Sequence, residues 1–463
     1  MTVPAPLYKR IAVIGGGPAG LAAAKALALE PSTFETIDLY ERRDKTGGLW
    51  YYGGDKSKTR PPVPSTVPYL KEHTRGNLSA SDKYFSPMYK HLETNLISSM
   101  MEYRDVHFPQ GTAVFPSRSE VLRYVLQYEK TIPDTVNIHM NANVVSIEKS
   151  DEWTVTIENT ENGSVIEKRY DAIVIANGHF EAPYIPDVPG LEDWNKKSDG
   201  SVTHAKYFDV ADAYKDKNVV VVGHFASGVD ISTQLSVCAR NVYVSVRNVE
   251  EITPSPDSQI KYIGLITNYD FDNDRTITTA ENEHIKDVDY IIYCTGYLYS
   301  IPFLKTYSDI ITDGNQLHDI YNQIFYIKDP SLTFVALCRN VIPMPLAESQ
   351  GAIIAKVYSG KLKLPTKEEM QLEYKKELEI RGTGKDFHSI PYPKDVEYYR
   401  ELQNILDRNG LNKEGLSPPI WDEKRANDRR DTKKLKSARQ EAIVEHASKL
   451  RESGESFRLL DSL

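Results

Sequence analysis

The sequence predicts an α/β protein with two Rossmann-like dinucleotide-binding domains, the smaller inserted into the larger. Near the N-terminus an unbroken apolar run, 11–14, is typical of a strand buried on both faces, and it leads into glycines spaced G-x-G-x-x-G. The same plan returns at 217–228. Each unit also has a later apolar strand that ends in glycine, at 171–178 and at 289–296. Strand, glycine turn and helix in this order predict a parallel sheet that binds a dinucleotide at its edge.

The first glycine motif consists of Gly15, Gly17 and Gly20, and an Ala/Leu-rich helix continues to residue 29. The first glycine permits a tight turn, the second lets the backbone approach a pyrophosphate, and the third lets helix pack on strand. Pro18 suits the first helical turn, where its missing N–H is no loss. We therefore expect the phosphates at the positive end of this helix.

An acid in one unit and a base in the other predict which dinucleotide each unit binds. Strand 37–41 ends in Glu41, about 20 residues after the last glycine, where a carboxylate accepts from ribose hydroxyls. The corresponding strand of the second unit ends in Arg247, which fits a ribose 2′-phosphate that Glu41 would repel. The first unit is therefore predicted to bind FAD and the second NADPH. The alternatives are a surface acid beside an ordinary glycine turn, and a solvated surface arginine.

The segments that follow the first unit extend this plan in chain order. Gly48, Leu49 and Trp50 form a loop that can lie against a ring system, with packing of Trp50 into the core as the alternative. Residues 53–87 contain several prolines and form a long irregular insertion. Apolar patterns predict a helix from Arg118 and strands over 136–140, 144–148 and 153–158.

The C-terminal part of the chain is highly charged and helical in pattern. Thr366 and Glu369 form a capping box. A later helix has one apolar face, made of Leu435, Ala438, Ala442, Ile443, Ala447 and Leu450. We expect this helix to dock on the larger domain. A membrane-surface helix is the alternative, because Lys433, Lys434 and Lys436 add positive charge at its start.

Composition excludes several classes of protein. The 463-residue chain is long enough for two or three domains, and its net charge of −9 argues against nucleic-acid binding. The three cysteines, Cys238, Cys294 and Cys338, form no C-x-x-C pair, so neither a disulfide scaffold nor a redox dithiol is expected. No metal site is predicted. No apolar run of about 18 residues and no signal peptide are evident, which favours a cytoplasmic protein. Peripheral association with the endoplasmic reticulum membrane is compatible with these features.

Several motifs together resemble the flavin-containing monooxygenases, in particular their yeast and fungal branch. The resemblance covers roughly residues 8–425 and rests on the sequences at 15–20, 47–50, 92–95, 294–303 and 417–421. The family motif F-x-G-x-x-x-H-x-x-x-[FY] is partly present, from Ser198 through His204 to Phe208. Ser198 replaces its first aromatic residue, and Phe225 replaces the middle glycine of the second dinucleotide motif. Both departures lie in the NADPH half. Alternatively, His204 is a structural residue at a domain boundary.

The resemblance implies a domain organisation and a chemistry. A FAD-binding domain would comprise 1–180 and 297–463, with the NADPH-binding domain, 181–296, inserted between them. In the family, NADPH reduces the flavin, O2 adds to form a C4a-hydroperoxyflavin, and a sulfur or nitrogen nucleophile attacks it. Asn95, in the Leu-Glu-Thr-Asn sequence, would be the catalytic amide at the flavin edge, with Thr94 helping to hold the nicotinamide. The alternative for Asn95 is a turn-forming residue after a strand.

The predicted cofactor contacts follow from the motifs and the resemblance. For FAD they are Gly15, Gly17, Pro18, Ala19, Gly20, Glu41, Arg42, Gly48, Leu49, Trp50, Val144 and Gln350, the last at a helix start. For NADPH they are Thr94, Asn95, Gly223, Ala226, Ser227, Gly228, Ser245 and Arg247.

The substrate is predicted only as a class: a small thiol, sulfide or amine that is oxygenated with O2. A homodimer is compatible with the sequence. A disulfide reductase shares the two-unit plan but lacks support without a dithiol. An NADPH oxidase-like flavoprotein and an NADP(H)-binding sensor with little oxygenase activity stay open, because Ser198 and Phe225 depart from the family pattern.

Overall fold

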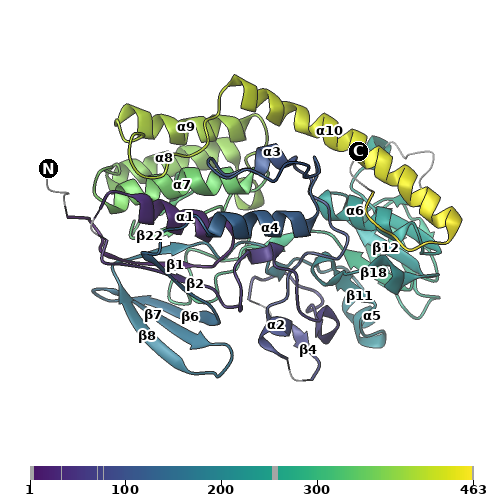
Figure 1. Ribbon diagram of the computed structural model, residues 1–463. Coiled ribbons are helices and arrows are strands. Elements are labelled where there is room, and N and C mark those ends of the chain that lie inside the picture. The colour runs from purple at the N-terminus through teal and green to yellow at the C-terminus, as the bar shows by residue number, and fades with distance from the viewer. Residues whose placement is uncertain (1–4, 33, 70, 77, 253–258, 461–463) are drawn as a thin grey trace. The chain divides into compact units, whose positions relative to one another are not determined.

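A computed structural model describes residues 5–32, 34–69, 71–76, 78–252 and 259–460 (Figure 1). The chain divides into two compact units. Unit 1 comprises 1–51, 96–179 and 299–432, and unit 2 comprises 52–95, 180–298 and 433–463.

Unit 1 is built on a seven-stranded sheet in the order β20-β21-β22-β9-β1-β2-β5. Its strands are β1 (Arg10–Ile14), β2 (Thr36–Tyr40), β5 (Val136–His139), β9 (Ala172–Ile175), β20 (Ile320–Tyr321), β21 (Phe325–Tyr326) and β22 (Leu332–Phe334). The five strands from β22 to β5 are parallel, and β21 pairs antiparallel with β22. Strand β1 therefore occupies the middle of the sheet, which explains its unbroken apolar sequence.

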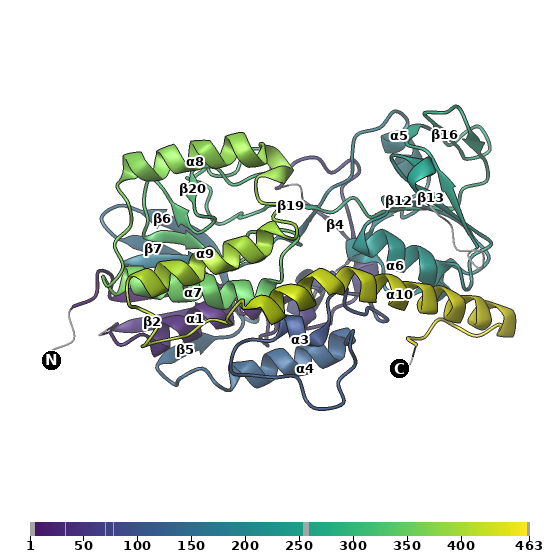
Figure 2. The same ribbon diagram turned by 90° about the horizontal axis from the view of Figure 1, so that it is seen from above.

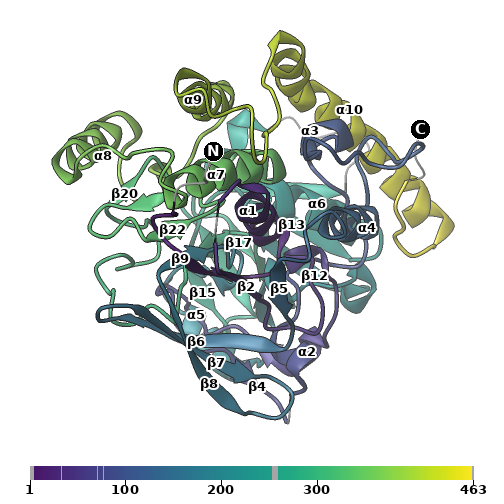
Figure 3. The ribbon, with the colours of Figure 1, turned by 60° about the vertical axis from the view of Figure 1, so that its left-hand side comes forward.

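Helices cover one face of this sheet and an antiparallel sheet covers the other (Figure 3). On one face Ile11 and Val13 join the core formed with the helices, and on the other Ala12 and Ile14 join the core of an antiparallel sheet. The helices of unit 1 are α1 (Pro18–Leu29), α3 (Ser98–Met101), α4 (Arg118–Glu129), α7 (Pro343–Tyr358), α8 (Lys367–Arg381) and α9 (Lys394–Arg408). The antiparallel sheet consists of β6 (Ala142–Lys149), β7 (Trp153–Asn159) and β8 (Val165–Tyr170).

Unit 2 contains a smaller parallel sheet in the order β11-β18-β12-β13-β14. Its strands are β11 (Val202–His204), β12 (Asn218–Val222), β13 (Asn241–Ser245), β14 (Ile260–Ile263) and β18 (Tyr290–Tyr293), and its helices are α2 (Ala80–Lys83), α5 (Leu191–Lys197) and α6 (Ala226–Leu235). The remaining strands of this unit are short: β3 (Thr59–Arg60), β4 (His73–Thr74), β10 (Ala182–Pro183), β15 (Ile266–Asp270), β16 (Thr276–Thr279), β17 (His284–Ile285) and β19 (Tyr297–Leu298).

Local predictions of structure are confirmed. The predicted strands over 136–140, 144–148 and 153–158 correspond to β5, β6 and β7, with small shifts at their ends. Helix α1 begins at Pro18, and Thr366 caps α8 in a reciprocal hydrogen-bonded box with Glu369. These features depend on a few neighbouring residues, which is why a single sequence predicts them.

Two long segments differ from the expected division of the chain. The insertion 53–87 packs within unit 2, where Lys56 Nζ donates to Phe208 O at 2.9 Å and Ser65 pairs with Ile185 across a β-bridge. Helix α10 (Glu423–Ser453) begins in unit 1, and its residues from Lys433 onward belong to unit 2. Neither segment was expected in the smaller domain.

The C-terminal part of α10 lies beside α6 (Figure 2). Ile443, Ala447 and Leu450 are buried with Val237, which follows α6. Leu435 is 45% exposed, so the predicted apolar face is buried only in its second half. The expectation that this face docks on the larger domain was wrong, because its partner is Val237 of unit 2.

Candidate functional site

The glycine turn of unit 1 leaves no room for side chains. Gly15 has φ +112°, and a Cβ there would lie 2.6 Å from Ala176 O. A Cβ on Gly20 would lie 1.8 Å from Gly15 O, so strand, turn and α1 are in direct backbone contact. The N-terminus of α1, with Ala19 in its first turn, therefore presents backbone N–H groups, which suit the pyrophosphate of a dinucleotide. The geometry fits FAD.

Glu41 lies directly against this turn. Its Oε2 accepts from Gly16 N at 2.9 Å, and its Oε1 accepts from Arg43 N at 3.0 Å. The side chain is almost fully buried. A carboxylate fixed at this place by two backbone N–H groups keeps lone pairs that suit a ribose hydroxyl donor, and the ribose contact itself stays a prediction. Arg42, the residue between Glu41 and Arg43, is partly buried.

The loop at 47–50 is held against the glycine turn. Gly47 and Gly48 have φ +110° and +55°, and a Cβ on Gly48 would lie 2.7 Å from Gly17 Cα. Arg43, which the sequence analysis did not single out, donates from its guanidinium to Gly48 O and, at 3.0 Å, to Tyr51 O. In the sequence, the one indication of a role for Arg43 is its position directly after the predicted contacts Glu41 and Arg42.

Other predicted flavin contacts lie inside unit 1. Leu49 is partly buried, and Trp50 packs at the margin of the core, as its alternative interpretation expected. Val144 is buried in β6. Gln350 has no exposed surface: its Oε1 accepts from Ala336 N at 2.8 Å and its Nε2 donates to Tyr398 OH at 3.0 Å. Its expected place at a helix start was wrong, because α7 begins seven residues earlier, at Pro343.

The glycine turn of unit 2 repeats that of unit 1 except at its middle position. Gly223 has φ +103°, and a Cβ on Gly228 would lie 2.0 Å from Gly223 O. Phe225 caps α6 with extended backbone, φ −108° and ψ −165°, so a side chain causes no strain there. Its ring is 71% exposed. Ala226 and Ser227 form the first turn of α6. The turn fits a dinucleotide whose phosphates approach beside the Phe225 side chain.

The two polar residues after this turn differ in accessibility. Arg247 is exposed just beyond β13, where a 2′-phosphate would lie. Ser245 is buried, and its hydroxyl donates to Gly264 O at 2.9 Å. The side chain of Ser245 therefore fixes the neighbouring strand end.

Thr94 and Asn95 end the first segment of unit 2. Thr94 is 4% exposed, and its carbonyl accepts from Lys436 Nζ at 3.1 Å. Asn95 is exposed, so its amide is accessible to a ligand. The structure thus places all of the predicted FAD contacts in unit 1, and all of the predicted NADPH contacts, Thr94 and Asn95 among them, in unit 2.

His204 is a structural residue in unit 2. Its Nε2 donates to Gly296 O at 2.9 Å, and its Nδ1 accepts from Lys206 N at 3.1 Å. Burial lowers the pKa of His204 to about 3, so the ring is neutral at pH 7. Both nitrogens are thereby engaged by the backbone, which agrees with the structural alternative.

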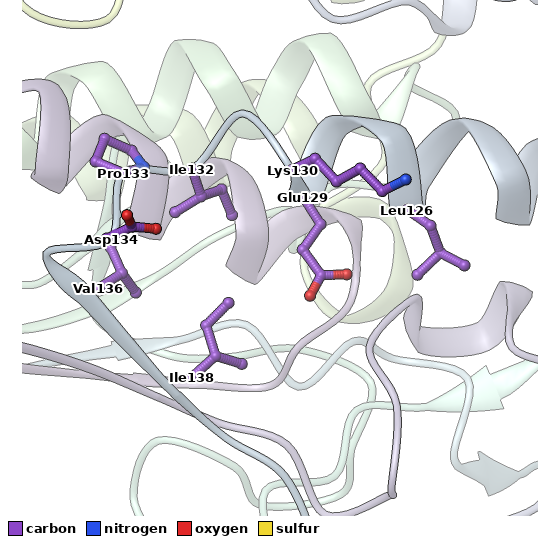
Figure 4. A pocket seen from close by; sticks show the side chains of 8 residues that line it. All are labelled: Leu126, Glu129, Lys130, Ile132, Pro133, Asp134, Val136 and Ile138. Carbon is purple, nitrogen blue, oxygen red and sulfur yellow. The ribbon is translucent and has the colours of Figure 1, made fainter.

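A hollow of about 460 Å³ in unit 1 lies apart from the predicted contacts (Figure 4). It lies between the end of α4 and β5, and it is lined by Leu126, Glu129, Lys130, Ile132, Pro133, Asp134, Val136 and Ile138. None of the predicted site residues lines it. Among the described residues, no group of His, Cys, Asp and Glu side chains is arranged to hold a metal ion. No helix in the described part of the chain is long and apolar enough to cross a membrane.

Comparisons with known proteins agree with this geometry. A model of flavin-binding monooxygenase-like proteins matches residues 78–254 and 269–410, and a model of NAD(P)-binding Rossmann-like domains matches 13–70. The chain is 29% identical to a thiol-specific monooxygenase of Saccharomyces cerevisiae, over 96% of each chain. It is 32% identical to the flavin-containing monooxygenase FMO GS-OX4 of Arabidopsis thaliana, over 82% of this chain and 80% of the relative.

A solved structure matches nearly all of the chain. The S-allyl-L-cysteine S-oxygenase of Allium sativum superposes with a TM-score of 0.79 and 28% sequence identity, covering 96% of this chain and 98% of that one. The family model covers well over half of the sequence, and it includes the second glycine turn, the Leu-Glu-Thr-Asn segment and α7. The protein is therefore a member of the flavin-binding monooxygenase-like family, an NADPH- and FAD-dependent monooxygenase.

Proposed function

We propose that the protein oxygenates a small, soft nucleophile at sulfur or nitrogen, with sulfur preferred. The observation that carries this proposal is the pair of dinucleotide turns in a chain of this family, one with an acid at the ribose position and one with a base. One relative is named for its specificity for thiols and another for S-oxygenation, which supports sulfur as the reacting atom. The balanced reaction consumes substrate, O2, NADPH and a proton, and yields the oxide, water and NADP⁺.

The residues of this chain bind and orient the reactants. In unit 1, α1 and Glu41 would hold the pyrophosphate and ribose of FAD. In unit 2, α6 and Arg247 would hold NADPH, with the guanidinium available to the 2′-phosphate. FAD held in unit 1 would supply the redox chemistry with NADPH and O2. Asn95 contributes a neutral amide that donates and accepts hydrogen bonds without losing or gaining a proton.

The test is to measure oxygenated product and NADPH consumption with a thiol, a sulfide and an amine as substrates. We expect product from the thiol or sulfide in near-equal amount to the NADPH consumed. An NADPH oxidase is the second candidate, and the exposed ring of Phe225 beside the phosphate position favours it. That enzyme would release hydrogen peroxide in amounts equal to NADPH consumed, with no oxygenated product.

Asn95→Ala tests the catalytic assignment. We expect FAD binding and NADPH oxidation to persist while product formation falls about 100-fold, the size typical for loss of one preorganised hydrogen-bonding group in an active site. The readouts are the flavin absorbance of the purified variant and the product formed per NADPH. Asn412→Ala is the matched control, because Asn412 is exposed in unit 1 and donates only to Asp407 Oδ1 among the described contacts. Normal oxygenation by Asn95→Ala would remove Asn95 from the mechanism.

A further inference from the structure

The segment that leads to Asn95 is held by cations from the C-terminal helix. Arg439 Nη2 lies 2.6 Å from Glu93 Oε2, and Arg439 Nε lies 3.2 Å and 3.1 Å from the two Glu93 oxygens. Lys436 Nζ lies 3.4 Å from Glu93 Oε1 and donates to Thr94 O at 3.1 Å. Lys436 and Arg439 of α10 thus bind the two residues immediately before Asn95. All of these residues belong to unit 2.

The contact between Glu93 and Arg439 is buried. The side chains of Glu93 and Arg439 are 5% and 11% exposed. Charge-assisted, forked hydrogen bonds of this kind are stronger and more directional than exposed pairs. Without Arg439, the Glu93 carboxylate would lose most of its compensation for burial, and it would gain by turning toward water. That movement would shift the backbone on which Asn95 stands.

Helix α10 is itself fixed to the predicted nucleotide-binding helix. Gln440 Nε2 donates to Thr233 Oγ1 of α6 at 3.1 Å. Arg451 donates to Ser236 O at 2.6 Å and to Ala239 O at 2.9 Å, just after α6. Gln234, also on α6, donates to His91 O at 3.2 Å. The segment before Asn95 is therefore fixed by α6 and α10, which are joined to each other.

We propose that Arg439 and Lys436 are positioning residues for Asn95, so that the C-terminal helix forms part of the active site. The proposal rests on the function proposed above. Asn95 is exposed, and its location depends on the backbone at 93–94 rather than on enclosure of its own side chain. Lys436, one of the three lysines considered above as a membrane-binding feature, lies within α10 and thereby acquires a positioning role through Thr94 O.

The experiment compares wild-type holoenzyme with Arg439→Gln. We expect faster amide hydrogen exchange in a peptide covering 92–96, an unchanged affinity for NADP⁺, and product per NADPH reduced about tenfold, since small displacements of a reacting geometry cost at least that much. Arg439→Lys should give more product per NADPH than Arg439→Gln, because lysine keeps the positive charge but loses the forked hydrogen bonds of the guanidinium. If Arg439→Gln fails to fold, Lys436→Gln, which leaves the arginine fork intact, tests the same contact more mildly.

Two variants on the same helix serve as controls. Lys449→Gln removes an exposed charge that pairs with Glu445. It should change neither amide hydrogen exchange at 92–96 nor the product formed per NADPH. Arg451→Gln loosens α10 from α6 without touching Glu93, so it reports the effect of helix docking alone. Wild-type exchange at 92–96 together with wild-type coupling in Arg439→Gln would overturn the proposal. Hydrogen exchange needs no turnover, so it tests the contact even if the wild-type enzyme oxygenates none of the three substrates, a result that would instead refute the proposed function.

Discussion

The two glycine turns are nearly identical in backbone conformation but differ in one side chain. Gly17 and Phe225 occupy equivalent positions before α1 and α6, and both have extended backbone. In unit 1 a Cβ at this position would meet Gly48 Cα at 3.2 Å, whereas in unit 2 the Phe225 ring is 71% exposed. The side chain in unit 2 is therefore accommodated without packing into the core, and we expect it to affect the bound nucleotide rather than the fold.

Phe225→Gly should strengthen NADP⁺ binding by about 1 kcal/mol, a roughly fivefold fall in Kd, because the phosphates could then approach the end of α6. Folding should be little affected, since glycine is a better N-cap than a large apolar residue. Titration calorimetry with NADP⁺ measures the change. Ile380→Ala, at another exposed apolar side chain, is the control. Weaker binding by Phe225→Gly would mean that the ring instead packs on the bound nucleotide.

Arg247→Ala tests the choice of nucleotide. We expect the KM for NADPH to rise about 10-fold to 100-fold, the value of charge-assisted hydrogen bonds to a phosphate, while the KM for NADH changes little. Steady-state kinetics with the two nucleotides give the comparison. Arg240→Ala is matched to it, because Arg240 is an exposed arginine at the other end of β13. Equal changes for the two nucleotides would contradict the 2′-phosphate assignment.

At the level of elements, a buried lysine ties the 53–87 insertion to the rest of unit 2. Lys206 Nζ lies 2.8 Å from Glu72 Oε1 and 3.0 Å from Glu181 Oε1, and Tyr207 OH donates to the same Glu72 oxygen. Burial alone would lower the pKa of Lys206, but Glu181 and Glu72 outweigh it and raise the pKa. The lysine is therefore charged at pH 7, and the insertion is docked by this cation.

Lys206→Met should destabilise unit 2 by about 2 kcal/mol, less than for a fully enclosed pair because Glu181 is partly exposed. It should also make the insertion sensitive to protease. Thermal unfolding and mapped limited proteolysis check both effects. Lys83→Met, at an exposed lysine of the insertion, should resemble wild type. A variant whose insertion resists cleavage as wild type does would show that other contacts suffice.

At the scale of the whole molecule, buried histidines and buried carboxyl groups change the free energy of unfolding in opposite directions as pH falls. Burial lowers the pKa of His388 in unit 1 and of His204 in unit 2 to about 3. Burial raises the pKa of Glu348 in unit 1 to about 7 and that of Asp230 in unit 2 to about 6. As pH falls below 6.5, the unfolded state takes up protons at the histidines while the folded state holds them at the acids. Asp230 therefore offsets His204 in unit 2, whereas Glu348 offsets only one of the two such histidines of unit 1, because burial also lowers the pKa of His179 to about 3.

Glu348→Gln should reveal this balance. The variant loses the proton that folded Glu348 holds against His388 and His179, so its stability should fall by about 1.4 kcal/mol per pH unit relative to wild type as pH decreases from 6.5 to 4.5. Unfolding midpoints measured across this range supply the test. Glu35→Gln, at a half-exposed acid of unit 1, should follow wild type. Parallel curves for Glu348→Gln and wild type would mean that Glu348 does not hold a proton in the folded state.

The sequence by itself determined the features that depend on a few consecutive residues. The turns at Gly15–Gly20 and Gly223–Gly228, the buried strand β1 and the cap at Thr366 were all predicted, because local sterics and hydrogen bonding dictate them. Glu41 was placed correctly at the glycine turn for the same reason, since it ends the strand beside β1.

Only the tertiary structure decided which distant segments meet. It assigned the insertion and the end of α10 to unit 2, buried Gln350 with its Oε1 accepting from Ala336 N, and paired Glu93 with Arg439. The sequence around Arg439 does not indicate its partner, because charged residues of this kind also occur on helix faces that contact only water. Its choice of Glu93 follows from how α10 packs on α6, and packing between elements far apart in the chain is not encoded in the pattern of either one.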